Sequence, residues 1–194
     1  MNSDKDIVIT SAFRTPIGSF QGSLKDHKAT ELGTAVVKKC MEHSNLNGSE
    51  VDTVILGQVL QTGCGQNPAR QAAINSGIDK DKTATTINQV CGSGLAAVTM
   101  GFNSLKLNDT NIVIAGGQES MTNSPHYLNY RMEKNLSEKK LKDSMLIDGL
   151  IDAYDDYHMG VTAENVAEKY QITRNDQDNF AFNSQKKAIK AISE

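Results

Sequence analysis

The chain has 194 residues, of which 38% are hydrophobic, and its 20 basic and 23 acidic residues give a formal net charge of -3. This length allows a buried core, whereas the near balance of charge gives no electrostatic argument for nucleic-acid binding. The apolar runs are too short to cross a bilayer, and the start MNSDKDIVIT carries neither a basic nor an apolar leader. We therefore expect a soluble, unprocessed protein without nucleic-acid or membrane partners.

Strand-like runs and helical spacings alternate along the first 117 residues. Four runs of strand formers predict strands, the first two of them buried, at 7–10, 54–60, 83–90 and 111–117. Three segments predict helices from their apolar spacing or end signals, at 29–43, 68–76 and 95–107. Because parallel strands need crossover connections of this kind, the pattern predicts an α/β fold with a parallel sheet covered by helices.

The character of the sequence changes after Met121. Residues 122–146 are polar and without a clear period, and we interpret them as an excursion from the sheet domain. Two further helices are expected at 162–170 and 173–192, the second opened by Thr173 with Asp176 three residues later, as in a capping box. No glycine or proline ends this last helix before the chain ends, so we expect the chain to be part of a longer protein.

The cysteines and histidines show no metal-binding or disulfide pattern. Cys40, Cys64 and Cys91 make an odd count without a CxxC pair, which favours reduced thiols in the cytoplasm. The four histidines are scattered, and none forms a closely spaced ligand pair with another histidine or a cysteine. We therefore expect no metal site.

The stretch NQVCGSGLAAV places Cys91 where a strand-like run gives way to glycines and then to a helical pattern. A cysteine at the first turn of a helix is near unpaired N–H groups and the positive end of the helix dipole, and both favour the reactive thiolate. The same amides are candidate donors to an oxyanion. The alternative is that Cys91 is an inert spacer, a small residue that lets the helix pack on the sheet. Local chemistry leaves both interpretations open.

Six stretches resemble thiolase patterns, in the order in which that family has them. They are ITSAFRTPIGSFQGSL, GQNPARQAA, NQVCGSGLAAV, AGGQESM with SPH, DGLIDAYDDYHMGVTAENVA and QDNFAFNSQKKA. The resemblance implies a layered α/β fold with a mixed, mostly parallel sheet. It also implies that 1–121 is the first α/β domain without its last strand and helix. Residues 122–194 would then be part of an inserted loop domain, including an excursion of the kind that joins dimers into tetramers.

The resemblance implies the chemistry as well. Cys91 would carry an acyl group as a thioester while two acetyl-coenzyme A molecules give acetoacetyl-coenzyme A and coenzyme A, reversibly. In the triplet HMG, His158 and Met159 resemble the residues that line the acyl and pantetheine end of the pocket in short-chain thiolases. Leu150 would contact the pantetheine arm, although a leucine there could equally belong to a core. These thioesters are substrates, no cofactor is expected, and a homodimer or tetramer is implied.

Thiolases are about twice as long as this chain, and their proton-handling His, Asn and second Cys lie in blocks that this sequence lacks. Two hypotheses follow. The chain is the N-terminal portion of an acyltransferase, inactive alone because general acid–base catalysis contributes roughly a hundred- to ten-thousand-fold. Alternatively, it is a non-catalytic thiolase fragment that serves at most as an assembly or binding module.

Overall fold

The structure is a computed structural model that describes residues 6–131 and 141–194. The chain divides into two compact units, Met1–Gly149 and Leu150–Glu194. The division predicted between residues 121 and 122 refers to the domains of a complete thiolase and stays a prediction. Residues 132–140 of the predicted excursion lie outside the described residues.

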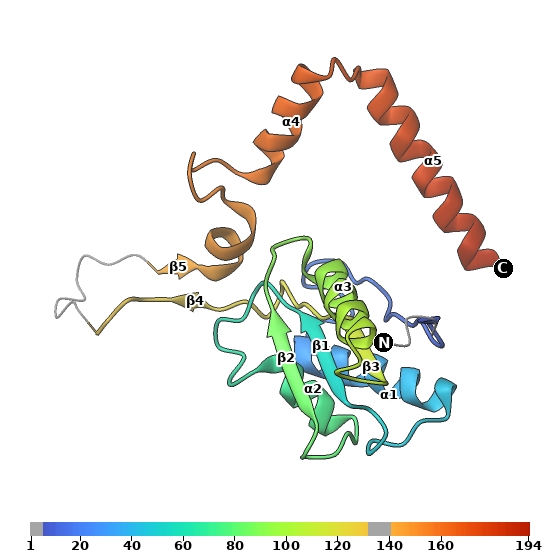
Figure 1. The fold of residues 1–194 in the computed structure, drawn as a ribbon. Helices are drawn as coiled ribbons and strands as arrows, with labels where there is room; N and C mark the ends of the chain where they lie inside the picture. Colours follow the sequence, from blue (N-terminus) through green and yellow to red (C-terminus); the bar gives the residue numbers. More distant parts are fainter. Residues whose placement is uncertain (1–5, 132–140) are drawn as a thin grey trace. The chain divides into compact units, whose positions relative to one another are not determined.

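A three-stranded parallel sheet lies at the centre of the first unit (Figure 1). Its strands are β1 (Thr53–Gly57), β2 (Thr83–Ile87) and β3 (Val113–Gly117), in the order β2-β1-β3. Helix α2 (Pro68–Asn75) connects β1 to β2, and α3 (Ser93–Lys106) connects β2 to β3. These crossovers confirm the predicted α/β class.

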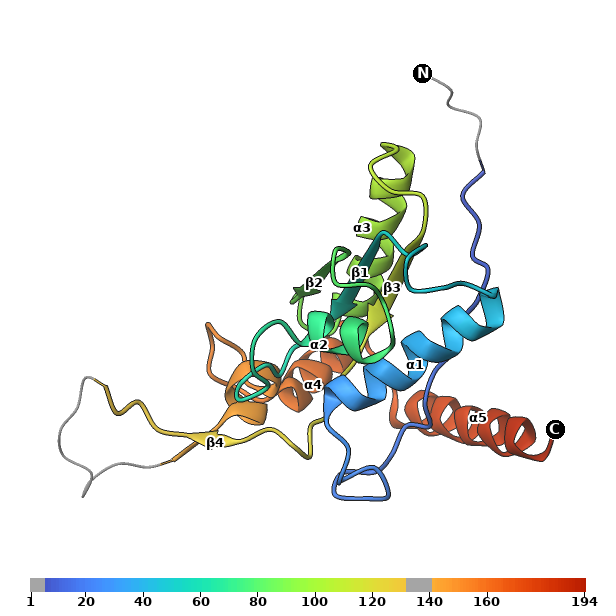
Figure 2. The same cartoon turned by 90° about the horizontal axis from the view of Figure 1, so that it is seen from below.

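The helices cover both faces of this sheet. Helices α1 (Ala29–Ser44) and α2 lie on one face, and α3 lies on the other (Figure 2). The main core forms between the sheet and the α1–α2 layer, from Val37, Met41, Val51, Val54, Leu56, Ala69, Ala72, Ala73 and Ile78. Burial of these side chains supplies the hydrophobic stabilisation of the unit.

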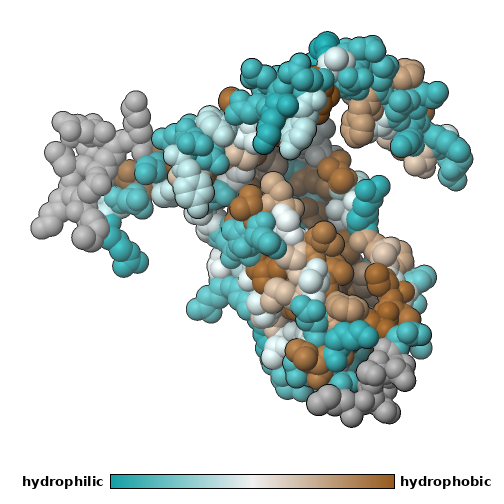
Figure 3. All heavy atoms as spheres, turned by 45° about the horizontal axis from the view of Figure 1, so that its top comes forward, coloured by the Kyte–Doolittle hydropathy of each residue, from teal (hydrophilic) through white to brown (hydrophobic). Residues whose placement is uncertain are grey.

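The α3 layer is buried on one side alone. Ser93, Ala97 and Gly101 face the sheet and are buried. Leu95 and Phe102 keep 75% and 47% of their surface exposed, and apolar side chains are visible on the surface of this unit in Figure 3. The helical spacing predicted for this segment is therefore present, but its Leu95, Val98 and Phe102 remain exposed.

The prediction of a buried strand at 7–10 was wrong. The segment forms no strand, and Val8 and Ile9 are 70% and 81% exposed. Ile7 and Val8 instead border a cavity of about 390 Å³ that also contacts Val113. A run of β-branched residues becomes a strand only where a neighbouring strand pairs with it, and the described sheet ends at β3.

Three strands were also predicted too long, and one of them, at 111–117, begins only at Val113. The run 54–60 leaves the sheet after Gly57, and the run 83–90 leaves it after Ile87. Those two residues are in register with each other, so both strands end at the same edge of the sheet. The residues beyond them form the loops that carry the polar groups of the candidate site.

Short irregular elements lie at the end of the first unit, and the last of them ends on Leu150, the first residue of the second unit. Strand β4 (His126–Tyr127) pairs antiparallel with β5 (Lys142–Asp143), which leads into the π-helical turn η1 (Leu146–Leu150). The antiparallel pair agrees with an excursion from the sheet. Its part in oligomer assembly stays a prediction.

The second unit contains α4 (Met159–Lys169) and α5 (Arg174–Ser193). Thr173 caps α5 as predicted: its hydroxyl accepts from the backbone N–H of Asp176 at 3.1 Å, and the Asp176 carboxylate accepts from the N–H of Thr173 at 3.1 Å. Every residue of α5 is exposed or half-buried. In the described part of the chain, no helix combines the length and apolar character that a membrane span needs.

Candidate active site

Cys91 lies in the turn between β2 and α3, at the edge of the sheet where the strands end. Gly92 is the N-cap of α3, so Cys91 directly precedes the cap and lies just outside the first helical turn in which it was predicted. Its side chain is exposed. A spacer between helix and sheet would be buried, so the exposed thiol does not fit the packing interpretation.

Side chains on both sides of Cys91 close this turn. The backbone N–H of Val90 donates to Oδ1 of Asn88 at 2.9 Å. The hydroxyl of Ser93 accepts from the N–H of Gln89 at 2.8 Å and donates to the carbonyl of Val90 at 2.6 Å. These bonds hold Val90 at φ +48°, a left-handed conformation that β-branched residues rarely adopt. The thiol is therefore presented from a constrained turn.

The α3 N-terminus approaches the strand ends through positions without side chains. A β carbon at Gly57 would lie 2.5 Å from the carbonyl carbon of Ser93, and one at Gly117 would lie 3.5 Å from the α carbon of Gly94. Glycine is required at Gly57 because the helix backbone occupies that space. The glycines that end β1 and β3 thus determine how closely the N-terminus of α3 approaches the sheet, and with it the position of the Cys91 turn.

Two amides that were expected to face a substrate are already paired. The N–H of Gly92 donates to the carbonyl of Gln89 at 3.1 Å, and the N–H of Ser93 donates to the carbonyl of Val90 at 3.0 Å. Neither amide is therefore an open oxyanion donor in this arrangement. The field of the helix N-terminus still acts near Cys91, because it arises from the aligned peptide groups of α3.

The other predicted site residues belong to the second unit. His158 is the N-cap of α4, and its Nδ1 accepts from the N–H of Gly160 at 3.0 Å. Met159 is the first residue of that helix, and Leu150 is half-buried at the end of η1. An isolated antiparallel bridge joins Ile151, the neighbour of Leu150, to His158. The structure therefore brings the predicted pantetheine-side segments together.

A polar cluster that we did not predict lies at the carboxyl ends of β1 and β3. Gln58 and Gln118 follow the glycines that end these strands; they are 1% and 7% exposed, and Nε2 of Gln118 donates to Oε1 of Gln58 at 2.9 Å. Within the described residues, Oε1 of Gln118 has no hydrogen-bond partner. The repeated Gly-Gln pair after two strand-like runs is the sequence signal that could have revealed this cluster.

Glu119 is the ionisable member of this region. Its carboxylate accepts from the backbone N–H groups of Val59 at 2.8 Å and Leu60 at 3.2 Å. The side chain also borders a cavity of about 480 Å³, with mostly apolar residues such as Phe20 and Leu24. Burial raises the pKa of the Glu119 carboxyl, and the bonds from the backbone amides offset part of that rise.

The fold and the site together define an α/β protein with an exposed cysteine where a parallel strand turns into a helix. Among residues 6–131 and 141–194, no group of three or more His, Cys, Asp or Glu side chains could hold a metal ion. The family model of the thiolase N-terminal domain matches residues 7–194. The chain therefore belongs to the thiolase family, as its motifs predicted.

Named relatives agree with this assignment. The chain is 52% identical to an acetyl-CoA acetyltransferase of Pseudomonas aeruginosa and 51% identical to a probable acetyl-CoA acetyltransferase of Escherichia coli. Each match covers 97% of this chain and 48% of the relative. A probable acetyl-CoA acyltransferase of Staphylococcus epidermidis is 52% identical over 95% of this chain and 47% of its own length. The chain thus spans about half the length of these curated relatives.

A solved thiolase has the same fold. The structure of the Acat5 thiolase from Ascaris suum in complex with coenzyme A aligns with a TM-score of 0.93 and 40% identity. The alignment covers 97% of this chain and 49% of the other. The predicted thiolase-like α/β class is therefore confirmed.

Proposed function

We propose that this chain is the cysteine-bearing portion of an acetyl-CoA acetyltransferase. The observation that carries the proposal is the exposed Cys91 in a constrained strand-to-helix turn, inside a chain that matches the thiolase family along nearly its whole length. Relatives named acetyl-CoA acetyltransferase and a related thiolase bound to coenzyme A support acetyl-coenzyme A and acetoacetyl-coenzyme A as substrates.

The thiolate of Cys91 attacks the carbonyl carbon of acetyl-coenzyme A, and the thiolate of coenzyme A leaves as the acetyl-cysteine thioester forms. A second acetyl-coenzyme A loses a proton from its methyl carbon, and the resulting carbanion attacks the acetyl carbon. The new carbon–carbon bond gives acetoacetyl-coenzyme A, and the Cys91 thiolate leaves. His158, Met159 and Leu150 are assigned to the acyl and pantetheine end of the substrate. No metal ion or further cofactor is needed.

The proton transfers call for bases that resemblance assigns to sequence blocks outside this chain. The chain alone is therefore proposed to lack turnover and to work together with the rest of a thiolase, in a homodimer or tetramer. The second candidate is a non-catalytic module. The apolar residues that α3 leaves exposed favour it, because such a surface suits the binding of another protein.

The reactivity of Cys91 tests the proposed role of this residue. Iodoacetamide is added near neutral pH to the folded chain, to the chain unfolded in urea and to a peptide of residues 88–98, and each cysteine is followed by mass spectrometry. A helix N-terminus contributes about 0.3–1 kcal/mol, so Cys91 should react roughly two- to fivefold faster in the folded chain. Equal rates in the three samples contradict a folded-state activation of Cys91.

The native assembly separates the two candidate functions. The mass of the protein is measured in the organism's extract with an antibody against this chain. An assembly whose subunits are close to twice 21.1 kDa, or that contains a second thiolase piece, supports the enzyme. A chain of 21.1 kDa without such a piece supports the non-catalytic module.

A further inference from the structure

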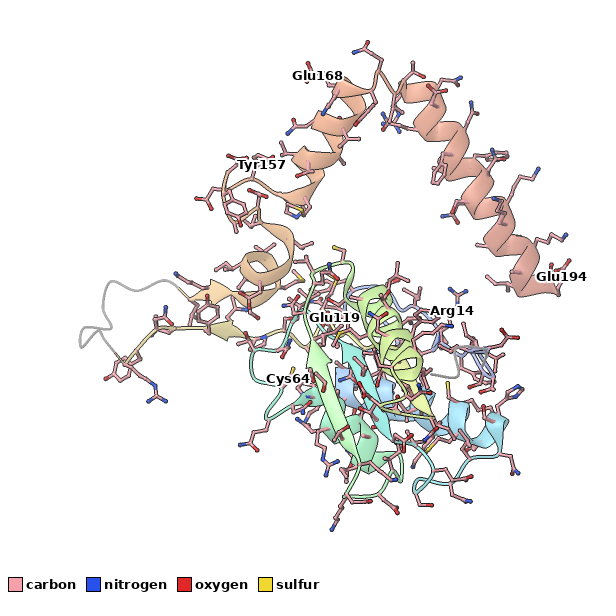
Figure 4. The ribbon with its side chains drawn as sticks, in the orientation of Figure 1. Arg14, Cys64, Glu119, Tyr157, Glu168 and Glu194 are labelled. Atoms are coloured by element: carbon pink, nitrogen blue, oxygen red, sulfur yellow. The ribbon has the colours of Figure 1, made fainter. Side chains whose placement is uncertain are left out.

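The loop that follows β1 contacts both Glu119 and the turn that carries Cys91. Its residues Val59 and Leu60 direct their backbone N–H groups at the Glu119 carboxylate, at 2.8 and 3.2 Å. Glu119 itself lies two residues beyond the end of β3. Figure 4 labels it at the end of the sheet where β1 and β2 finish. One carboxylate therefore ties the β1 loop to the chain that leaves β3.

The other side of the loop reaches the Cys91 turn. The carbonyl of Val59 accepts from Nδ2 of Asn88 at 3.5 Å. The same Asn88 side chain uses its Oδ1 to accept the N–H of Val90, the residue before Cys91, at 2.9 Å. The peptide groups of Val59 and the amide of Asn88 thus form a continuous path from Glu119 to the turn.

A carboxylate suits this position better than an amide. Each oxygen of Glu119 accepts one of two adjacent N–H groups. A glutamine would keep one acceptor and turn its NH2 group toward the other N–H, where two donors would face each other. Because the site is partly buried, an unpaired backbone N–H there costs more than at the surface.

The backbone around the loop is otherwise fixed at the sheet edge. The N–H of Gln58 donates to the carbonyl of Ile87 at 3.0 Å, and the N–H of Gln118 donates to the carbonyl of Gly57 at 2.9 Å. These bonds hold the loop where it leaves β1. Beyond Gln58, the Glu119 carboxylate holds the next two amides, so this carboxylate sets the orientation of the Val59 carbonyl that meets Asn88.

We propose that Glu119 is a positioning residue for Cys91, which acts through the Val59 peptide and Asn88 to hold the turn that presents the thiol. The inference rests on the proposed function, because it assumes that Cys91 is the acyl-accepting residue. Glu119 does not touch the reacting atoms in this role. It keeps Val90 in its left-handed conformation by keeping Asn88 in place.

The experiment is a double-mutant cycle on the alkylation rate of Cys91 in the full chain. The variants are Glu119→Gln, Asn88→Ala and the double variant, with the exposed Glu164→Gln on α4 as the matched control. Rates with iodoacetamide are measured between about pH 6 and 9, the range in which cysteine thiols form thiolates. Cys40 on α1 is the internal reference thiol, and circular dichroism follows the fold.

Each single variant should slow Cys91 by roughly two- to fivefold, as expected if the turn no longer holds the thiol at the helix N-terminus. The double variant should be no slower than either single variant. Glu164→Gln and the Cys40 rate should remain at the parent values. A double variant that shows the product of both effects means that Glu119 and Asn88 act independently, and this overturns the proposal.

Two more outcomes overturn it. One is that Cys91 in Glu119→Gln is alkylated at the same rate as in the parent chain. The other is an equal change in the alkylation rates of Cys40 and Cys91, which indicates that the whole fold has loosened. The proposed function fails separately, when Cys91 of the parent chain reacts no faster folded than unfolded. The comparison of the folded with the unfolded parent chain thus tests the role of Cys91, and the variants test the role of Glu119.

Discussion

Gly57 at the end of β1 lies directly against Ser93 at the start of α3, so that a β carbon on Gly57 would be 2.5 Å from the carbonyl carbon of Ser93. Gly57→Ala forces the helix away from the sheet, and we expect it to lower the free energy of unfolding by about 1–3 kcal/mol. Urea denaturation measures this change. Gly116→Ala is the control, because a β carbon at Gly116 meets nothing within 4 Å. Equal losses in both variants would contradict the close approach.

The sequence predicted those parts of the fold that depend on local patterns. Strand formers that alternate with helical spacings correctly predicted β1, β2, β3 and the helices between them, and Thr173 correctly predicted the start of α5. The strand predicted at 7–10 was wrong because the hydrophobicity of this run shows that it could be buried. It does not show whether a neighbouring strand is present to pair with it. Whether a strand is buried depends on its neighbours in the sheet, and a short stretch of sequence does not show which segments those neighbours will be.

The candidate site was predictable for Cys91 and not for Glu119. The glycines around Cys91 and the change from strand to helix mark a turn that can be recognised within a dozen residues. The Glu119 carboxylate meets amides 60 and 59 positions earlier in the chain. That meeting follows from the parallel register of β1 and β3, in which Gly57 is opposite Gly117. The contact of Glu119 with Val59 and Leu60 could therefore be predicted only from the register of the two strands.

Asp52 ties the start of β1 to the start of β3. Its Oδ2 accepts from the backbone N–H groups of Asn111 at 2.7 Å and Ile112 at 3.1 Å, and these bonds lower the pKa of Asp52 from 3.8. Asp52→Ala should lower the free energy of unfolding by about 1 kcal/mol near neutral pH, the ordinary value of such a bond in a solvated place. Asp81→Ala, at an exposed aspartate, should leave it unchanged.

The pH dependence of this effect has a definite sign. Because the pKa of Asp52 is lower in the folded than in the unfolded chain, its stabilisation is present above pH 3.8 and is lost as the pH falls through the folded value. The difference between the parent chain and Asp52→Ala should therefore shrink below pH 3.8, as measured by urea denaturation at a series of pH values. A difference that grows on acidification would exclude the assigned bonds.

Glu119 should give the opposite dependence. Burial raises its pKa above 4.5, so the folded chain binds this proton more tightly than the unfolded chain does. Its contribution to stability is then greatest below pH 4.5 and is lost as the pH rises through the folded value. Glu119→Gln cannot titrate there, so the parent chain should gain stability relative to this variant on moving from neutral pH toward 4.5. Parallel curves for the two proteins in urea denaturation would contradict the burial of a charged carboxylate.

Ser93 closes the Cys91 turn with one hydroxyl that both accepts and donates, and only 4% of the residue is exposed. Ser93→Ala keeps the β carbon, so it creates no clash with β1, but it leaves the N–H of Gln89 without this acceptor. We expect a loss of about 1–3 kcal/mol in the free energy of unfolding, the cost of leaving a partly buried donor unpaired. The alkylation of Cys91 should slow as Val90 leaves its left-handed conformation. Thr99→Ala is the control on the same helix, since its exposed hydroxyl donates to the carbonyl of Leu95 one turn earlier. If Ser93→Ala destabilised the chain but left the rate of Cys91 unchanged, the hydroxyl would support the helix and not the presentation of the thiol.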